Sequence, residues 1–133
     1  PIDAVATCLF LLLLWGEHTA DMQMFDFQTE KYRRKDAGEA AGPYGKGFIT
    51  TGLWGLSRHP NYFCEVSMWW TFYLFSIAAS GDVLNPSVIG AVLLTILFVP
   101  PHASLDVTES LSSRKYPEYK EYQKLVSRFV PFM

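Results

Sequence analysis

Three long stretches without a charged residue, separated by polar segments, give the chain its pattern. Residues 4–15 are apolar without a break, residues 66–80 are rich in aromatic and aliphatic side chains, and residues 83–105 carry no charge. A helix that crosses a bilayer needs about 20 predominantly apolar residues, so the first stretch would cross only with its flanking residues included. The pattern predicts an all-α membrane protein with about three transmembrane helices.

Shorter signals indicate where these helices break. Residues 37–47 contain four glycines and one proline, which predicts a loop. Pro100 and Pro101 predict a kink or an unwound turn, because proline lacks the amide hydrogen that a helix interior needs. Residues 118–129 repeat aromatic and aliphatic side chains at helical spacing. They are predicted to form an amphipathic helix that lies on the membrane or folds over the bundle.

Composition agrees with a membrane protein and excludes one class of partner. The 133 residues fit a single membrane domain, residues 1–133. Half of them are hydrophobic and only 18% are charged, against about 25% in soluble domains. A net charge of −2 without a basic stripe gives no sign of nucleic-acid binding. Cys8 and Cys64 lie in apolar segments at no metal-like spacing, so we expect no metal site and two buried cysteines.

The basic residues are confined to two parts of the chain. All eleven lysines and arginines fall in residues 31–58 and 114–128, and the predicted turn at residues 81–87 has none. By the positive-inside rule, the loop 31–58 and the C-terminus of a multi-pass protein would face the cytosol or its equivalent. Side chains that are far apart in sequence are therefore expected to converge at that membrane face.

The densest polar cluster is Ser57-Arg-His-Pro-Asn-Tyr-Phe-Cys-Glu65, directly before the second apolar stretch. Pro60 suits the first turn of a helix. Asn61 and Glu65 would then share one face of that helix, with Tyr62 beside them. An ionisable group inside an apolar span is costly, so Glu65 is by default a functional-site residue.

These residue types suit a charged, hydrogen-bonding cofactor. Arg58 and the basic segment 31–35 could bind phosphates. Asn61 offers a donor and an acceptor to an amide or an adenine edge, Glu65 could accept from a ribose hydroxyl, and His59 could titrate near neutral pH. A competing interpretation makes Arg58 and segment 31–35 anchors at the membrane surface. The chain has no Gly-x-Gly-x-x-Gly motif, so a dinucleotide would not bind in the Rossmann mode.

The central motif resembles the Ser-Arg-His-Pro-Asn-Tyr-Phe-Gly-Glu motif of bacterial and plant proteins related to steroid 5-alpha-reductase, the DUF1295 family. Sterol reductases carry a related Arg-His-x-x-Tyr motif. Ala20-Asp21-Met-Gln23 is similar to the family's Ala-Asp-x-Gln, and Glu109 and the segment from Tyr116 to Pro131 are similar to its ending. The resemblance covers nearly the whole chain.

The resemblance implies a membrane-embedded helical bundle with an NADPH pocket at the cytosolic face. It implies hydride transfer to a carbon–carbon double bond of a lipid or steroid-like enone. It identifies no catalytic residue. By motif position, the residues on the cofactor side would be Asp21, Arg58, His59, Asn61, Tyr62, Glu65 and Glu109.

The chain departs from the family's pattern at three points. Cys64 stands in place of a glycine, which puts a close backbone approach there in doubt. The segment between Tyr116 and Tyr119 lacks the family's Gly-x-Asp-Pro insertion. The family's N-terminal spans, which in the steroid reductases supply the substrate pocket and polarise the enone, are absent. The chain therefore resembles the cofactor-binding half of an enzyme.

Two other functions stay open. Isoprenylcysteine carboxyl methyltransferases share an Arg-His-Pro-x-Tyr motif and bind S-adenosylmethionine, although Asn61 and the Phe-Cys-Glu continuation favour the reductases. A short relative of the family could instead be a non-catalytic structural subunit, without a cofactor, packed against other membrane subunits. The expected partners are the lipid bilayer and, for an enzyme, a lipid-like small-molecule substrate.

Overall fold

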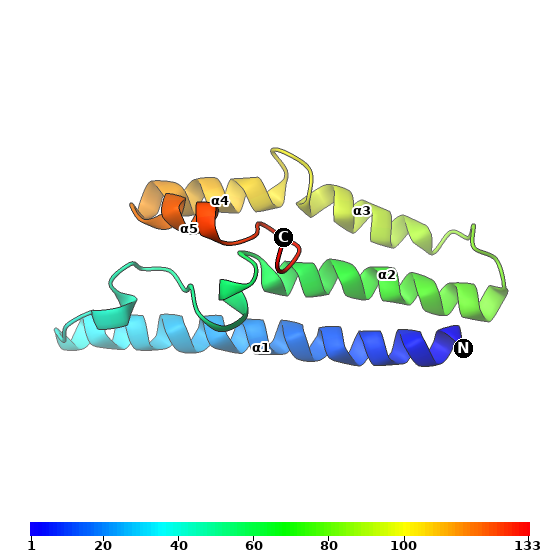
Figure 1. Cartoon of the computed structure of the whole chain (residues 1–133), viewed down its shortest axis with the longest axis horizontal. Helices are drawn as coiled ribbons and strands as arrows, with labels where there is room; N and C mark the ends of the chain where they lie inside the picture. The colour runs from blue at the N-terminus through cyan, green and yellow to red at the C-terminus, as the bar shows by residue number, and fades with distance from the viewer.

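Helix α1 (Ile2–Ala37) runs along the molecule, and the other elements lie on one side of it (Figure 1). The computed structural model describes all 133 residues. The other elements are the helices α2 (Pro60–Ser80), α3 (Val88–Phe98), α4 (Ser104–Lys115) and α5 (Tyr119–Leu125), and the 3-10 turns η1 (Gly42–Tyr44) and η2 (Gly52–Gly55). The structure contains no strand, so the all-α prediction is confirmed.

Helix α1 joins the first apolar stretch to the basic segment in one unbroken helix of 36 residues. A helix of that length is about 54 Å long. Its end is set by Gly38, whose φ of 69° is the left-handed conformation that favours glycine. The Gly38 amide donates to the carbonyls of Arg34 and Lys35, whose side chains suit the negative end of the helix dipole. The predicted glycine-rich loop begins at this cap.

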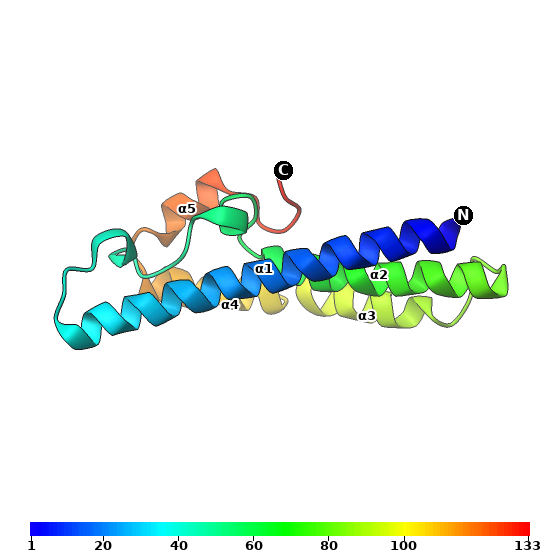
Figure 2. The ribbon, with the colours of Figure 1, turned by 90° about the horizontal axis from the view of Figure 1, so that it is seen from below.

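Helix α2 packs antiparallel along α1 (Figures 1 and 2). It begins at Pro60, as predicted, and ends at Gly81, which has a φ of 78°. The two helices approach closely at Gly16, because a Cβ there would lie 3.0 Å from Cys64 Sγ. The sequence put a close backbone approach at Cys64 in doubt. In the structure the two helices come close at this point because Gly16 of α1 has no side chain.

The third apolar stretch is broken in two, as the proline pair predicts. Helices α3 and α4 are separate and are joined by residues 99–103, in which His102 has a left-handed φ of 67°. Arg128 holds this break: Nη1 donates to Val99 O at 2.7 Å, and Nη2 pairs with Asp106 at 2.5 Å. Asp106 in turn accepts a hydrogen bond from the His102 amide at 2.8 Å.

The C-terminal helix is shorter than predicted. The amphipathic spacing predicts a helix over residues 118–129, but α5 has seven residues. Beyond it the backbone turns back to the central motif: Ser127 O accepts from the Arg58 amide at 2.8 Å, and Ser57 Oγ donates to Phe129 O at 2.7 Å. These bonds replace the helical ones, and they tie the end of the chain to the start of α2.

The outer face of α1 is apolar and uncovered. Leu11, Leu12 and Trp15 are 58%, 61% and 63% exposed, and only 6% of the helix's apolar 18-residue window is buried. Cys64 is buried as predicted, but the prediction for Cys8 is wrong, because no element covers this face. By length and composition α1 is the one helix that could cross a membrane, and α3, although apolar, has eleven residues. The count of three spans stays a prediction.

The two basic parts of the chain meet at one end of the molecule. The N-terminus and the turn between α2 and α3 lie at one end, and the loop after α1, α4 and α5 lie at the other (Figure 1). Residues 31–58 and 114–128, which hold all the lysines and arginines, therefore come together in space. Which side of a membrane this end would face stays a prediction.

Candidate functional site

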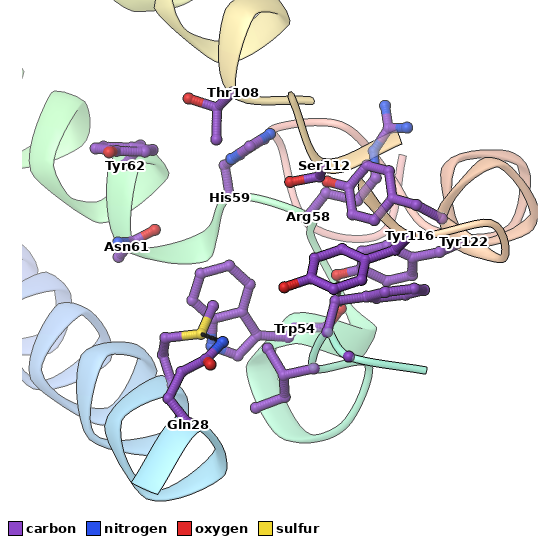
Figure 3. A pocket seen from close by; sticks show the side chains of 15 residues that line it. Gln28, Trp54, Arg58, His59, Asn61, Tyr62, Thr108, Ser112, Tyr116 and Tyr122 are labelled. Atoms are coloured by element: carbon purple, nitrogen blue, oxygen red, sulfur yellow. Dashed lines mark hydrogen bonds between the residues drawn. The ribbon is translucent and has the colours of Figure 1, made fainter. Parts of the chain in front are cut away.

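A cavity of about 320 Å³ lies where α1, the loop before η2, the start of α2, α4 and α5 meet (Figure 3). Its size is at the lower end of small-molecule pockets, which hold about 300–1,000 Å³. Six of the fifteen lining residues are phenylalanine, tryptophan or tyrosine, and no carboxylate takes part in the lining. The lining residues are Met24, Gln28, Gly47, Phe48, Ile49, Trp54, Arg58, His59, Asn61, Tyr62, Thr108, Ser112, Tyr116, Tyr119 and Tyr122.

The segment before the central motif is fixed to α1. The Trp54 indole N–H donates to Ala20 O at 3.0 Å, and the Leu53 amide donates to Gln23 Oε1 at 3.0 Å. Gly52 has a φ of 62°, and a Cβ there would lie 2.6 Å from the Gln23 side-chain amide, so only glycine fits. The Ala-Asp-x-Gln segment of α1 thus positions η2 and the motif that follows it.

Ser57 fixes the residue that precedes α2. Its hydroxyl oxygen accepts a hydrogen bond from the His59 amide at 3.1 Å, and its hydrogen goes to Phe129 O. Both Ser57 and His59 are buried. The serine of the motif therefore orients the histidine and is not itself a lining residue, a role that the sequence pattern did not indicate.

Glu109 of α4 gathers three partners from other parts of the chain. His59 Nε2 lies 2.9 Å from Glu109 Oε1, and Gln123 Nε2 donates to Oε2 at 3.0 Å. Arg58 Nε lies 3.2 Å from Glu109 Oε1, which makes an ion pair without a hydrogen bond from Nε. Arg58 Nη1 donates to Gln123 O at 3.2 Å. Glu109 and Arg58 are both largely shielded from solvent.

The charge of Glu109 follows from this environment. Burial by itself would raise the pKa of Glu109, but hydrogen bonds from His59 and Gln123 and the charge of Arg58 outweigh it and hold the pKa below its ordinary value. The carboxylate is therefore ionised at neutral pH. Arg58 is bound to it rather than left free, so the expected contact of Arg58 with a phosphate stays a prediction that this geometry does not favour.

Asn61 presents an unpaired oxygen next to the cavity. Its Nδ2 donates to Asp21 Oδ1 of α1 at 3.2 Å. A carboxylate only accepts hydrogen bonds, so the amide nitrogen must face Asp21, and Oδ1 is left on the other side. This oxygen is buried and has no hydrogen-bond partner. A ligand that supplies a donor would satisfy it.

The remaining predicted residues divide between the cavity and the helix interface. Tyr62 lines the cavity and stacks on Phe98 of α3, with ring centroids 4.9 Å apart. Glu65 lies one turn further along α2, outside the lining, where it accepts from Trp69 Nε1 at 3.0 Å and faces Glu17 of α1. Of the seven predicted residues, four line the cavity, Asp21 and Glu109 contact three of those four, and Glu65 lies apart.

A contact at the cavity that sequence reasoning missed joins Lys31, Gly47 and Tyr116. Lys31 Nζ donates to Gly47 O at 2.9 Å and to the Tyr116 hydroxyl at 3.2 Å. In contrast, Arg33 and Arg34 of the same basic segment pair with Glu30. No periodicity links these three residues, since they come from α1, the loop and the end of α4.

The comparisons agree with the resemblance of the motif. The profile of the family described as a protein of unknown function, DUF1295, matches residues 1–126. An uncharacterized protein of Schizosaccharomyces pombe is 35% identical over 137 residues, which cover 97% of this chain and 39% of that protein. The chain thus spans about two fifths of the length of this relative. No solved structure matches the chain.

Proposed function

We propose a function for this chain, which belongs to the DUF1295 family: it is the NADPH-binding part of a membrane-embedded reductase. The reaction would reduce a carbon–carbon double bond of a lipid or steroid-like compound. Since the chain covers 39% of its yeast relative, the substrate and any further subunits of a whole enzyme are part of the same proposal.

The observation that carries the proposal is the unpaired oxygen of Asn61 beside an aromatic cavity. A carboxamide or an exocyclic amino group, as on nicotinamide or adenine, would donate the hydrogen bond that this oxygen lacks. Flat rings pack well against aromatic side chains such as Trp54 and Phe48. A volume of about 320 Å³ admits one end of a dinucleotide, and the charge of Lys31 suits its phosphates.

The chain's own residues would bind and orient the cofactor. When bound, NADPH supplies the hydride. Asn61 would fix the orientation of one ring, and the surrounding aromatic side chains would exclude water from it. Glu109 would keep Arg58 and His59 in position behind the ring.

The charge of the lining supports NADPH over S-adenosylmethionine. The methyl donor carries a sulfonium, an ammonium and a carboxylate and is a cation overall, whereas NADPH is a polyanion. The lining contains no aspartate or glutamate, and the Lys31 ammonium contacts Gly47 and Tyr116 of the lining rather than a carboxylate, so the charge at the cavity suits the anion.

The uncovered face of α1 supports a location in the membrane. Burial of apolar surface is worth about 25 cal/mol per Å², and a contiguous exposed patch of this kind marks a surface that lipid or protein covers. The same face would suit a structural subunit packed into a larger complex. Cofactor binding separates the two functions, because only the reductase requires it.

The test is a titration of the purified chain in detergent with NADPH, followed by energy transfer from its four tryptophans. We expect saturable binding that Asn61→Ala weakens at least about fivefold, since a buried hydrogen bond is worth roughly 1 kcal/mol or more. Leu125→Ala, an exposed position outside the cavity, is the matched control. Equal affinity in wild type and Asn61→Ala would contradict the site, and displacement by S-adenosylmethionine would favour the methyltransferase.

A further inference from the structure

Three apolar side chains at and after the end of α5 are exposed next to one another. Leu125 is 83% exposed, Phe132 82% and Met133 86%. All three line one hollow of about 220 Å³, which they share with Leu56. We call these three exposed residues the end patch. Apolar side chains that gather on a surface in this way mark a place that lipid or protein covers.

The backbone fixes the end patch against the central motif. The Phe132 amide donates to Leu56 O at 3.3 Å, and the Ser127 hydroxyl donates to Val130 O. Phe132 has a left-handed φ of 67°, a conformation that residues other than glycine adopt only where the surrounding structure holds them in it. The exposed ring of Phe132 therefore belongs to a folded segment and is not part of a loose end.

The end patch lies at the level where α1 changes from apolar to polar. Phe129, shortly before the patch, packs against Phe63 of α2 with ring centroids 5.5 Å apart. The next residue of α2, Cys64, meets Gly16 of α1, which directly follows the apolar residues 4–15. Figures 1 and 2 both place the last residues level with the middle of α1. A bilayer that encloses the apolar part of α1 would therefore have its surface at the level of the patch.

Apolar side chains connect α1 with the segment after α5. Leu9 and Leu13 of α1 line a groove of about 520 Å³ together with Phe63 of α2, and Phe63 also packs against Phe129. On the exposed side of α1, Trp15 ends the apolar stretch, and tryptophan is enriched at this place, the membrane–water interface. The end patch is thus continuous with the apolar surface for which we propose contact with lipid.

Charged groups border the patch next to Leu125. Lys46 lines the neighbouring hollow, together with Glu118 and Glu121. Glu121 is paired with Lys124, whereas Lys46 makes no ion pair. Cations and anions beside apolar side chains suit the headgroup region of a zwitterionic phospholipid, in which phosphate and ammonium groups lie directly above the acyl chains.

We infer that the end patch is an anchor in the membrane interface, where Leu125, Phe132 and Met133 insert between phospholipid headgroups. The inference rests on the membrane location in the proposed function and adds to it a second contact with lipid, separate from α1. It differs from the amphipathic helix predicted over residues 118–129, because the two tyrosines of α5 are buried at the cavity. The bonds between residues 127–129 and the central motif would then hold the cavity at the bilayer surface.

The experiment places a nitroxide label at three positions of the full chain in phosphatidylcholine vesicles. The variants are Phe132→Cys in the patch, Leu12→Cys on the apolar face of α1 and Lys35→Cys at its polar end. Each carries Cys8→Ser as well, because Cys8 is exposed and would also take the label. Oxygen dissolves in acyl chains and a nickel chelate stays in water, so the collision rates of the label with the two reagents report its depth.

We expect the label at Phe132→Cys to lose most of the collisions with the nickel chelate that the label at Lys35→Cys makes. Its collisions with oxygen should exceed those at Lys35→Cys and stay below those at Leu12→Cys, because the interface is shallower than the centre of a span.

A second variant keeps an aromatic side chain in the patch. Phe132→Trp should be quenched more strongly by lipids brominated near the headgroup than by lipids brominated near the end of the acyl chain. The signal of the four native tryptophans, measured in wild type, is subtracted. Lys35→Trp is the matched control, and neither lipid should quench it.

The outcomes separate the inference from the proposed function. If the label at Leu12→Cys meets the nickel chelate as often as the label at Lys35→Cys does, α1 does not lie in lipid, and the proposed membrane location fails together with the anchor. If Leu12→Cys lies in lipid but Phe132→Cys behaves as Lys35→Cys does, the anchor alone is overturned. The anchor is also overturned if the label at Phe132→Cys is shielded from both reagents, since protein would then cover the patch, or if brominated lipids do not quench Phe132→Trp.

Discussion

Glu109 is the residue on which the order of the central motif depends. It is one carboxylate with a histidine and an arginine on one oxygen and a glutamine on the other. Its partners belong to the start of α2 and to the end of α5, so one side chain on α4 links three segments. Because Arg58 is shielded from solvent, its charge needs this carboxylate.

We predict that Glu109→Gln destabilises the folded chain by about 3–5 kcal/mol, because it leaves a buried arginine without its counter-charge. The measurement is denaturant unfolding in detergent. The matched control is Glu121→Gln, which breaks the exposed pair of Glu121 with Lys124, and which should change stability little. A similar loss in both variants would show that the buried network contributes no more to stability than the exposed ion pair.

The stability difference between wild type and Glu109→Gln should also depend on pH. The pKa of Glu109 is lowered in the folded state, so its contribution is complete above the unfolded-state value, about 4.3 for a glutamate, and is lost as pH falls through the folded-state pKa. The stability difference between wild type and Glu109→Gln should therefore be constant near neutral pH and shrink in acid. A difference that stays the same down to pH 3 would contradict the role of the charge.

At the scale of elements, two glycines distinguish the cost of a left-handed backbone conformation from the cost of a steric clash. Gly38 and Gly47 have φ values of 69° and 88°, but a Cβ on Gly38 would meet nothing within 4 Å, whereas one on Gly47 would lie 2.3 Å from the Tyr116 ring. A side chain at either position adopts the left-handed conformation, which costs roughly 1–2 kcal/mol.

We therefore expect Gly38→Ala to lower the free energy of unfolding by only that conformational cost and to leave NADPH affinity unchanged. Gly47→Ala should lose more stability and should also weaken NADPH binding, because the Tyr116 ring and the Lys31 contact must move. Unfolding and tryptophan energy transfer on the two variants measure both effects. Identical behaviour of the two variants would mean that the loop does not shape the cavity.

Element boundaries with a local cause could be predicted from the sequence. Pro60 marks the start of α2, and the pair Pro100 and Pro101 marks the break between α3 and α4. The end of α5 could not be predicted, because the spacing of residues 118–129 is helical. The Ser57 hydroxyl and the Arg58 amide donate to the carbonyls of Phe129 and Ser127 and take that segment out of the helix, so a distant contact overrides a local preference.

The residues of the candidate site divide in the same way, into those that the local sequence predicts and those that depend on distant contacts. The motif itself is contiguous, so Arg58, His59, Asn61 and Tyr62 could be assigned to one cavity from sequence. The pairing of Lys31 with Tyr116 could not be predicted, since it spans 85 positions and neither residue stands out from its polar neighbours. Nor does the sequence indicate that Glu65 would have Trp69 as its own partner.

At the scale of the whole molecule, the chain has one apolar side, which is the uncovered face of α1, and one polar end, where the basic residues lie. The apolar window of α1 lies away from the end that holds the cavity. This arrangement agrees with the membrane location that we propose, with the cavity at the polar end of the molecule.

We predict that Leu12→Lys lowers the fraction of the chain that stays in membrane vesicles after an alkaline wash. A lysine near the centre of a spanning helix costs about 2.5–3.5 kcal/mol. Thr29→Lys adds the same charge to an exposed position on the polar part of the same helix, so it should leave membrane retention unchanged. Equal retention of both variants would argue that α1 does not lie in the lipid.

The hydrogen bonds from the central motif to backbone carbonyls of residues 123–129 set an order of events during translation. Arg58 and Ser57 leave the ribosome long before Gln123, Ser127 and Phe129, which accept their hydrogen bonds. The motif therefore cannot complete these hydrogen bonds until residues 123–129 have been synthesised. A ribosome that stalls before residue 123 would release a chain in which helices α1 to α4 are complete and the site is unformed, a species for quality-control proteases to recognise.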